Sequence, residues 1–346
     1  YNVHFAANGG SGTMQDQSEY QPAALTSNAF TRTGYTFNGW NTQQDGMGTS
    51  YADGDTYSFG ANTTLYASWL VNNYTLTFDE NDGSATTETQ NYDYGSTNAL
   101  THTTAWTRTG YDLLGWATTA GATSAASSYT VHADATLYAV WRIKNFAITF
   151  AKNDGSATTV NHSYNYGATN VLSLANPWTR VGYTFAGWGT SASDTTAATS
   201  FTATQAATLY AIWKVNNYTL TYAKNDGGAV TTTSPTTFGA TDALNFANPW
   251  TRTGYDFLGW ATTANATTAA SSFTVSGSTT LYAVWRIQSY VFTFDKNDGS
   301  STTVNHSYNF GANNVLSFAN PWTRTGYTFL GWNESASAAS AATSQN

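Results

Sequence analysis

The chain has 346 residues, no cysteine, a formal net charge of -8 and only 12 lysine and arginine residues. The lack of cysteine excludes disulfides, zinc–thiolate sites and a cysteine nucleophile, and the scarcity of basic residues argues against nucleic acids and anionic membrane surfaces as partners. Charged residues make up 9% of the chain and aromatic residues 16%, so Thr, Ser, Asn and Gly must supply most of the polar surface.

A ten-residue motif recurs along the chain. It reads Thr-Arg-Thr-Gly-Tyr-Thr-Phe-Asn-Gly-Trp at residues 31–40, and related copies end at Trp116, Trp188, Trp260 and Trp332, after steps of 76 residues and then three times 72 residues. A long motif at a nearly constant step predicts a tandem array. A unit of this size buries only about 60% of its unfolded surface, so it needs a dense core or support from its neighbours. The predicted repeats are 1–73, 74–145, 146–217, 218–289 and 290–346, the last incomplete.

The first half of each repeat predicts a hairpin and a short helical segment. Residues 74–78 alternate apolar and polar side chains, which predicts a strand with one buried face. The Asn-Asp-Gly sequence at 81–83 favours positive φ and predicts a tight hairpin turn, before a second, Thr-rich strand such as 158–166. Residues 170–178 alternate less and end at a Pro-Trp pair, which fits one or two helical turns because the residue before proline resists the helix.

The second half of each repeat predicts two more strands. Gly34 and its counterparts are expected to turn the chain into a strand whose Tyr, Phe and Trp face the core. A variable loop such as 117–128 follows, and Thr-Leu-Tyr-Ala-x-Trp at 136–141 predicts a closing strand. The fifth repeat reaches Asn346 without this sequence, so we expect either that the natural chain continues or that a neighbouring molecule supplies the strand. The junctions between repeats have no flexible spacer, which predicts a stiff rod.

Tryptophan and arginine recur at fixed positions, and all 13 tryptophans fall at three positions of the repeat. Because a small unit needs large apolar side chains, we expect tryptophans to form the cores; the alternative is an exposed row that stacks sugars. The arginine is expected to stack on an aromatic ring or to bind a carbonyl or carboxylate group; the alternative is an acidic ligand. The expected core residues are Trp40, Trp69, Trp116, Trp141, Trp188, Trp213, Trp260, Trp285 and Trp332, the other tryptophans are Trp106, Trp178, Trp250 and Trp322, and the recurring arginines are Arg32, Arg108, Arg180, Arg252 and Arg324.

No repeat carries a distinctive catalytic cluster. The carboxylates of the Asn-Asp-Gly turns suggest calcium, but their spacing differs from the alternating pattern of a calcium loop, so we interpret them as turn residues. They belong to Asp82, Asp154, Asp226 and Asp298. His162 and His306 share a repeat position without a second ligand or acid–base partner in the pattern. We therefore predict that the protein is not an enzyme and has no metal and no cofactor.

The repeats resemble the Listeria–Bacteroides repeat family, the internalin B-repeats. The resemblance rests on Tyr-x-Val-x-Phe-x-x-Asn-Gly-Gly, the ten-residue motif and Thr-Thr-Leu-Tyr-Ala-x-Trp, and it is closest in repeat 1, which also has Asp-Gly-Met-Gly-Thr at 45–49. Repeats 2 to 5 replace this acidic loop with Ala, Thr and Ser. The resemblance implies a small β-grasp-like sheet with a short helix, an extracellular location on bacterial surface proteins, a stalk or adhesion role, and no catalytic residues.

The sequence thus predicts a mainly β (α+β) tandem array of five β-grasp-like repeats. We expect a non-enzymatic, extracellular stalk or adhesin segment of a bacterial surface protein. Two alternatives are the subunit of a self-assembling filament joined by strand addition and a repeated glycan-binding module. The expected partners are neighbouring repeats, copies of the chain, or a glycan or protein of a host or cell surface. No run is apolar enough to predict membrane insertion.

Overall fold

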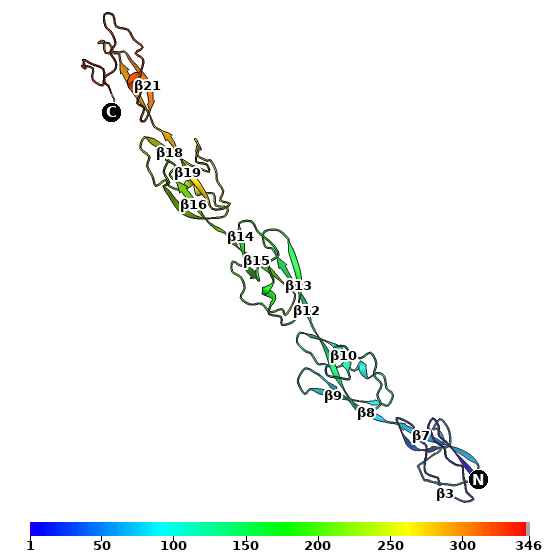
Figure 1. The fold of residues 1–346 in the computed structure, drawn as a ribbon. Helices are drawn as coiled ribbons and strands as arrows, with labels where there is room; N and C mark the ends of the chain where they lie inside the picture. Colours follow the sequence, from blue (N-terminus) through cyan, green and yellow to red (C-terminus); the bar gives the residue numbers. More distant parts are fainter. Residues whose placement is uncertain (344–346) are drawn as a thin grey trace. The chain divides into compact units, whose positions relative to one another are not determined.

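The computed structural model describes residues 1–343, which form five successive repeats, each with a small main sheet, a second, two-stranded sheet in repeat 1 and almost no helix (Figure 1). The prediction of a mainly β tandem array is confirmed. Asn346, where a neighbouring molecule was expected to add a strand, lies outside the described residues.

Repeat 2 shows the common sheet. Its strands are β8 (Asn73–Asp79), β9 (Thr87–Asp93), β10 (Tyr111–Ala117) and β11 (Ala135–Ile143), in the order β10-β11-β8-β9. The first and last strands, β8 and β11, run parallel at the centre, with Phe78 opposite Leu137. Antiparallel partners flank them, because β8 forms a hairpin with β9 and β11 pairs with β10.

The other repeats use the same strands with small variations. Repeat 1 adds short edge strands, and in repeat 5 the described residues form only a two-stranded sheet. The strands of repeat 1 are β1 (Asn2–Ala6), β2 (Gln17–Ser18), β3 (Ala23–Ala24), β4 (Tyr35–Asn41), β5 (Ser50–Tyr51), β6 (Thr56–Tyr57) and β7 (Thr63–Val71); those of repeat 3 are β12 (Asn145–Ala151), β13 (Thr159–Asn165), β14 (Tyr183–Gly189) and β15 (Ala207–Val215); those of repeat 4 are β16 (Asn217–Ala223), β17 (Thr231–Thr237), β18 (Tyr255–Ala261) and β19 (Thr279–Ile287); those of repeat 5 are β20 (Ser289–Asp295) and β21 (Thr303–Asn309).

The expected helical turns are shorter than predicted. Repeats 2 to 5 each contain one three-residue 3-10 turn, η1 (Ala99–Thr101), η2 (Val171–Ser173), η3 (Ala243–Asn245) and η4 (Val315–Ser317). After the turn in repeat 3, the Asn176 side chain donates to the Trp178 carbonyl oxygen at 2.8 Å and accepts from the Trp178 amide at 3.1 Å. Asparagine side chains that bind nearby backbone in this way disfavour helix.

The hairpin connection is longer than the predicted tight turn. Asp79 pairs with Thr87, so residues 80–86 form the loop between β8 and β9. Asn81 and Gly83 do adopt positive φ, at 53° and 96°. The loop is long because the Asn81 side chain does not close a two-residue turn: it donates to the Ala139 carbonyl oxygen of β11 at 2.8 Å and to that of Ala120 at 2.9 Å.

A bulge sets the buried face of the motif strand. In β18 the pairing with β19 shifts between Phe257 and Gly259, and Gly259 has a φ of 135°. One extra residue in a strand returns the next side chains to the same face. Phe257 and Trp260 therefore lie together, three positions apart, with ring centroids 5.2 Å apart.

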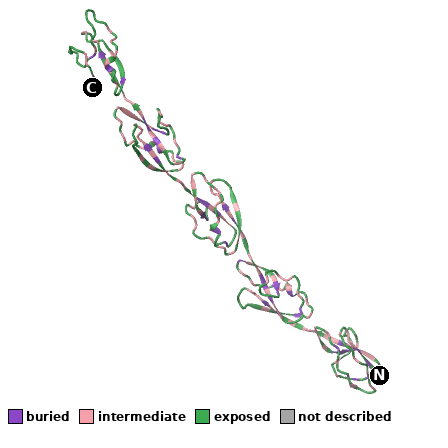
Figure 2. Cartoon of the chain, in the orientation of Figure 1, coloured by how far each residue is buried: buried purple, intermediate pink, exposed green. Residues whose placement is uncertain are grey.

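Each repeat has its own core. The core clusters of repeats 1, 2, 4 and 5 draw their residues from one repeat each, and the buried residues lie inside the small sheets (Figure 2). Trp260 is 1% exposed and packs with Leu281 and Val275. In repeat 5, residues 327–333 are not a strand, since the closing strand that pairs with this segment elsewhere is absent from the described residues.

Candidate functional site

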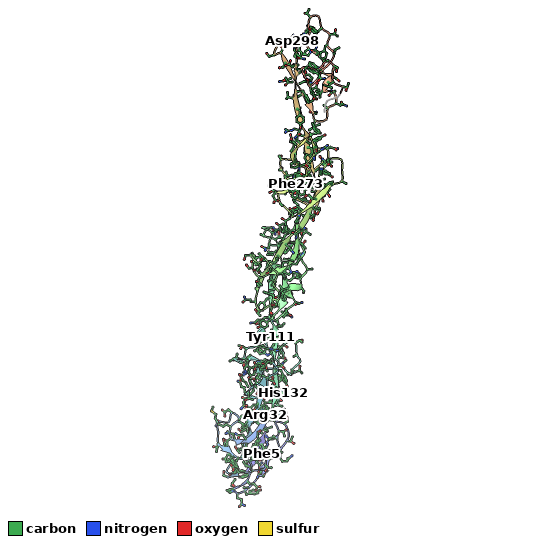
Figure 3. All side chains as sticks on the ribbon, turned by 90° about the vertical axis from the view of Figure 1, so that its left-hand side faces the viewer. Phe5, Arg32, Tyr111, His132, Phe273 and Asp298 are labelled. Atoms are coloured by element: carbon green, nitrogen blue, oxygen red, sulfur yellow. The ribbon has the colours of Figure 1, made fainter. Side chains whose placement is uncertain are left out.

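The recurring arginine lies over a tyrosine of the same motif in every repeat. The guanidinium carbon of Arg32 is 3.8 Å from the centroid of the Tyr35 ring, and the other four pairs are at 3.8 to 4.1 Å. On its other side, Arg32 lies next to Gly9 of the Asn-Gly turn. Arg32 and Tyr111 belong to two of these stacks (Figure 3). The arginines are thus engaged within their own repeats.

The same motif builds the junction between consecutive repeats. One residue, Asn72, separates β7 from β8; its amide donates to the Gly34 carbonyl oxygen at 2.9 Å, and its carbonyl oxygen accepts from the Tyr94 amide at 2.8 Å. The Tyr94 ring, from repeat 2, covers the α-carbon of Gly34 so closely that a side chain there would collide with it. Gly34 also has a φ of 80°, which favours glycine.

All four junctions repeat these contacts. A Tyr or Phe ring of the following repeat covers the glycine of the motif, and the single junction residue bonds to both at 2.8 to 2.9 Å. This aromatic residue was not predicted from the sequence, although its recurrence before a glycine at a 72-residue step is visible there. The sets are Gly34, Asn72 and Tyr94; Gly110, Lys144 and Tyr166; Gly182, Asn216 and Phe238; and Gly254, Gln288 and Phe310.

The tryptophans hold loops as well as filling cores. The indole nitrogen of Trp141, in the closing strand, donates to the Glu80 carbonyl oxygen at 2.7 Å, and that of Trp116 donates to the His102 carbonyl oxygen at 3.0 Å. The indole nitrogen of Trp40, by contrast, is buried without a hydrogen-bond partner. The five tryptophans that end the ten-residue motif are buried, and the other eight are half-buried.

The carboxylates of the Asn-Asp-Gly turns are used within the turns. Asp154 Oδ2 lies 2.8 Å from Lys152 Nζ, and Asp154 Oδ1 accepts from the Ser156 amide at 3.0 Å. The hydrogen bond from Lys152, followed by those from Ser156, holds the pKa of Asp154 below its ordinary value of 3.8. Asp298 of repeat 5 (Figure 3) has the same partners in Lys296 and Ser300. These carboxylates are already satisfied by neighbouring donors.

Two histidines have carboxylate partners that the sequence did not suggest. His4 Nδ1 lies 2.7 Å from Asp16 Oδ1, and His102 Nε2 lies 3.0 Å from Glu88 Oε2. The hydroxyl of Thr104 donates to the same Glu88 carboxylate at 3.2 Å rather than to the imidazole. A serine- or threonine-type nucleophile needs the histidine itself as its base, so this arrangement does not activate Thr104.

The loop after the motif differs between repeat 1 and the others. In repeat 1 the buried Asn41 side chain organises it by donating to the carbonyl oxygens of Gly46 and Gly48 at 3.0 and 3.2 Å. In repeat 4 the corresponding residue is Ala261, and buried Val284 replaces the half-buried Ser68 on the closing strand. The hydrogen bonds of Asn41 thus hold the acidic loop of repeat 1, whereas repeat 4 has the apolar residues Ala261 and Val284 at the corresponding positions.

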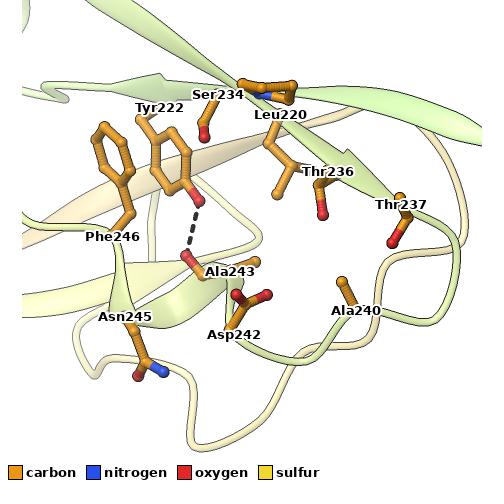
Figure 4. A pocket seen from close by; sticks show the side chains of 11 residues that line it. Leu220, Tyr222, Ser234, Thr236, Thr237, Ala240, Asp242, Ala243, Asn245 and Phe246 are labelled. Carbon is orange, nitrogen blue, oxygen red and sulfur yellow. Dashed lines mark hydrogen bonds between the residues drawn. The ribbon is translucent and has the colours of Figure 1, made fainter.

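Hollows lie on the surfaces of repeats 1 and 4. One, of about 530 Å³, lies in repeat 1 around Asn2, His4 and Tyr66. The other, of about 400 Å³, lies in repeat 4 between β16, β17 and η3 (Figure 4). Among residues 1–343, no group of three or more His, Cys, Asp or Glu side chains is placed to hold a metal ion. Over the same residues, no helix has the length and apolar character needed to cross a bilayer.

Comparison with known proteins connects these repeats to a family. The Listeria-Bacteroides repeat domain matches residues 1–68, 74–140, 146–212, 218–284 and 290–346. The chain is 31% identical, over 88% of its length, to a protein of Evansella cellulosilytica described as a "Putative Gly-rich membrane protein". It is 32% identical, over 76% of its length, to a second protein of that organism, described as a "Putative membrane protein". The chain spans only 35% and 39% of the lengths of these two relatives. Because the family matches all five repeats, the chain belongs to the Listeria-Bacteroides repeat domain family.

Proposed function

We propose that the chain is a non-enzymatic segment of a bacterial surface protein and acts as a stalk that holds other parts of that protein away from the cell. The observation that carries this proposal is the junction between repeats, which uses the same three repeat positions and the same two backbone hydrogen bonds four times. A spacer needs adjacent units that do not collapse onto one another. A flexible Gly/Ser linker would let them do so.

The junction restricts motion by two independent contacts. The backbone bonds tie the single connecting residue to both repeats, so its dihedral angles are not free. The aromatic ring covers the motif glycine, and rotation about the junction would break this contact. The surface supports the same role, because only 9% of the chain is charged and its polar groups are short and neutral.

The comparisons support the cellular setting. Both relatives are described as membrane proteins and are much longer than this chain, which fits a repeat segment within a large anchored protein. We propose an extracellular location on this basis. An adhesive role would require a ligand-binding part in addition to the repeats.

Light scattering combined with small-angle X-ray scattering tests the stalk role. The proposal expects a monomer near 37.1 kDa whose maximum dimension increases in proportion to the number of repeats in chains truncated at repeat boundaries. A maximum dimension that stays nearly constant as repeats are added would refute the proposal. Growth of the particle mass with concentration would instead support the filament alternative.

A further inference from the structure

The hollow in repeat 4 exists because one ring is missing from the core. Position 236 on β17 is a threonine, whereas the corresponding positions in repeats 2, 3 and 5 are Tyr92, Tyr164 and Tyr308. Tyr92 and Tyr308 are 7% and 8% exposed and belong to the cores of their repeats. No residue of β17 belongs to the core cluster of repeat 4. The space that a tyrosine ring fills elsewhere is therefore open here.

The hydrogen bond of the lost tyrosine is replaced, but its volume is not. In repeat 5 the Tyr308 hydroxyl donates to the Val315 carbonyl oxygen of η4 at 3.5 Å. Repeat 4 has Tyr222 at the core position where repeat 5 has Phe294. The Tyr222 hydroxyl donates to the Ala243 carbonyl oxygen of η3 at 2.7 Å. Repeat 4 thus keeps its 3-10 turn tied to the sheet and still has a cavity of about 400 Å³ next to it.

The lining of this hollow combines an apolar floor with a polar, acidic rim. Leu220 and the Tyr222 ring form the floor, and Phe246 stacks on Tyr222 with ring centroids 4.0 Å apart. Thr236 from β17 and Asp242 from the segment before η3 point toward the space (Figure 4). The corresponding residue in repeats 2, 3 and 5 is asparagine, so repeat 4 alone among these repeats has a negative charge here. Burial, and then the charge of Asp242, raise the pKa of Tyr222 above its ordinary value.

We propose that this hollow binds a small ligand that carries an aromatic six-membered ring and a positively charged amine. The ring would occupy the space of the missing tyrosine side chain, against Leu220 and Tyr222. The amine would face Asp242 at the rim. A hollow of this size that combines an apolar floor with convergent polar groups can hold a small molecule, and an unfilled ring-sized space next to a core favours a ring that fills it.

Tyramine is the probe for this site, because it combines a phenol ring with an ammonium group. We expect saturable shifts of the Ala240 and Ala243 methyl resonances in the full chain, with a Kd of about 1 mM or tighter for a ligand of this size. Phenol, which lacks the amine, should shift the same resonances but bind up to about fivefold more weakly, as expected for a solvent-exposed ion pair.

Two variants decide between this site and non-specific binding. Thr236→Tyr restores the residue of repeats 2, 3 and 5 and should abolish tyramine binding. Asp242→Asn restores the rim of those repeats and should weaken tyramine to the affinity of phenol without changing phenol binding. The proposal is overturned if tyramine leaves the repeat 4 resonances unshifted, or if it binds folded Thr236→Tyr as tightly as the parent. If Asp242→Asn weakened the binding of phenol and of tyramine equally, the proposal that the Asp242 carboxylate binds the amine would be refuted.

Discussion

Replacing Asn225 by alanine tests how the hairpin loop is fastened to the sheet. The Asn225 side chain donates to the Ala283 carbonyl oxygen of β19 at 2.9 Å and to that of Ala264 at 3.0 Å. Its backbone φ is 58°, in the left-handed region that asparagine tolerates and alanine does not. Asn225→Ala therefore loses two hydrogen bonds and strains the backbone.

The two losses can be estimated separately. Two hydrogen bonds contribute about 1–3 kcal/mol net, and an alanine in the left-handed region costs about 1–2 kcal/mol. The sum of about 2–5 kcal/mol means that the hairpin loop of the Asn225→Ala variant should open at least about 30-fold more often than that of the parent chain. Hydrogen exchange followed by mass spectrometry should show this acceleration in peptides from residues 224–230 and from β19. Peptides of repeat 2 provide the internal control, since they lie in another core.

Asn225→Gly separates the hydrogen bonds from the backbone cost. Glycine adopts positive φ freely, so this variant should lose only about 1–3 kcal/mol. Equal exchange in the alanine and glycine variants would show that the backbone conformation contributes nothing. Unchanged exchange in both would refute the view that this asparagine fastens the loop.

Two further substitutions test other recurring features. Gly110→Ala places a methyl group against the Tyr166 ring, whereas the control, Gly95→Ala, has the same φ within a degree and open space around it. Hydrogen exchange of the junction peptide 138–148 should therefore rise clearly more in Gly110→Ala than in Gly95→Ala. Equal exchange in the two variants would show that the ring contact is unimportant. Asp154→Asn should destabilise repeat 3 at pH 7, because a carboxyl with a lowered pKa stabilises the folded state above its ordinary pKa of 3.8. Hydrogen exchange should show this difference shrinking as the pH falls below about 4, and a pH-independent difference would exclude the ion pair with Lys152 as its cause.

The existence and chain order of the main strands follow closely from the sequence because their signals repeat. Alternation marks β8, and the closing sequence marks β11. The bulge at Gly259 could have been inferred from the motif itself, since Phe257 and Trp260 are three positions apart and cannot share a face of a regular strand.

Other features depend on contacts that distant residues make. The loop after β8 is long because Asn81 reaches carbonyl groups 39 and 58 positions away, which no local turn pattern reveals. The segment after β13 has one 3-10 turn, and Asn176 beyond it binds the backbone of Trp178, two residues further on. The hollow of repeat 4 was visible only by comparing repeats, where Thr236 replaces a tyrosine. No catalytic motif marks this hollow, because it results from the absence of a tyrosine side chain at position 236.

The central claim is that the junction fixes adjacent repeats, and a distance measurement tests it most directly. The chain has no cysteine, so Ser27→Cys in repeat 1 and Ser127→Cys in repeat 2 give two specific, exposed spin-label sites. Pulsed electron spin resonance should give one narrow distance distribution in the parent background. Tyr94→Ala, which removes the ring from Gly34, should broaden it while both repeats stay folded. A parent distribution as broad as that of Tyr94→Ala would contradict the account.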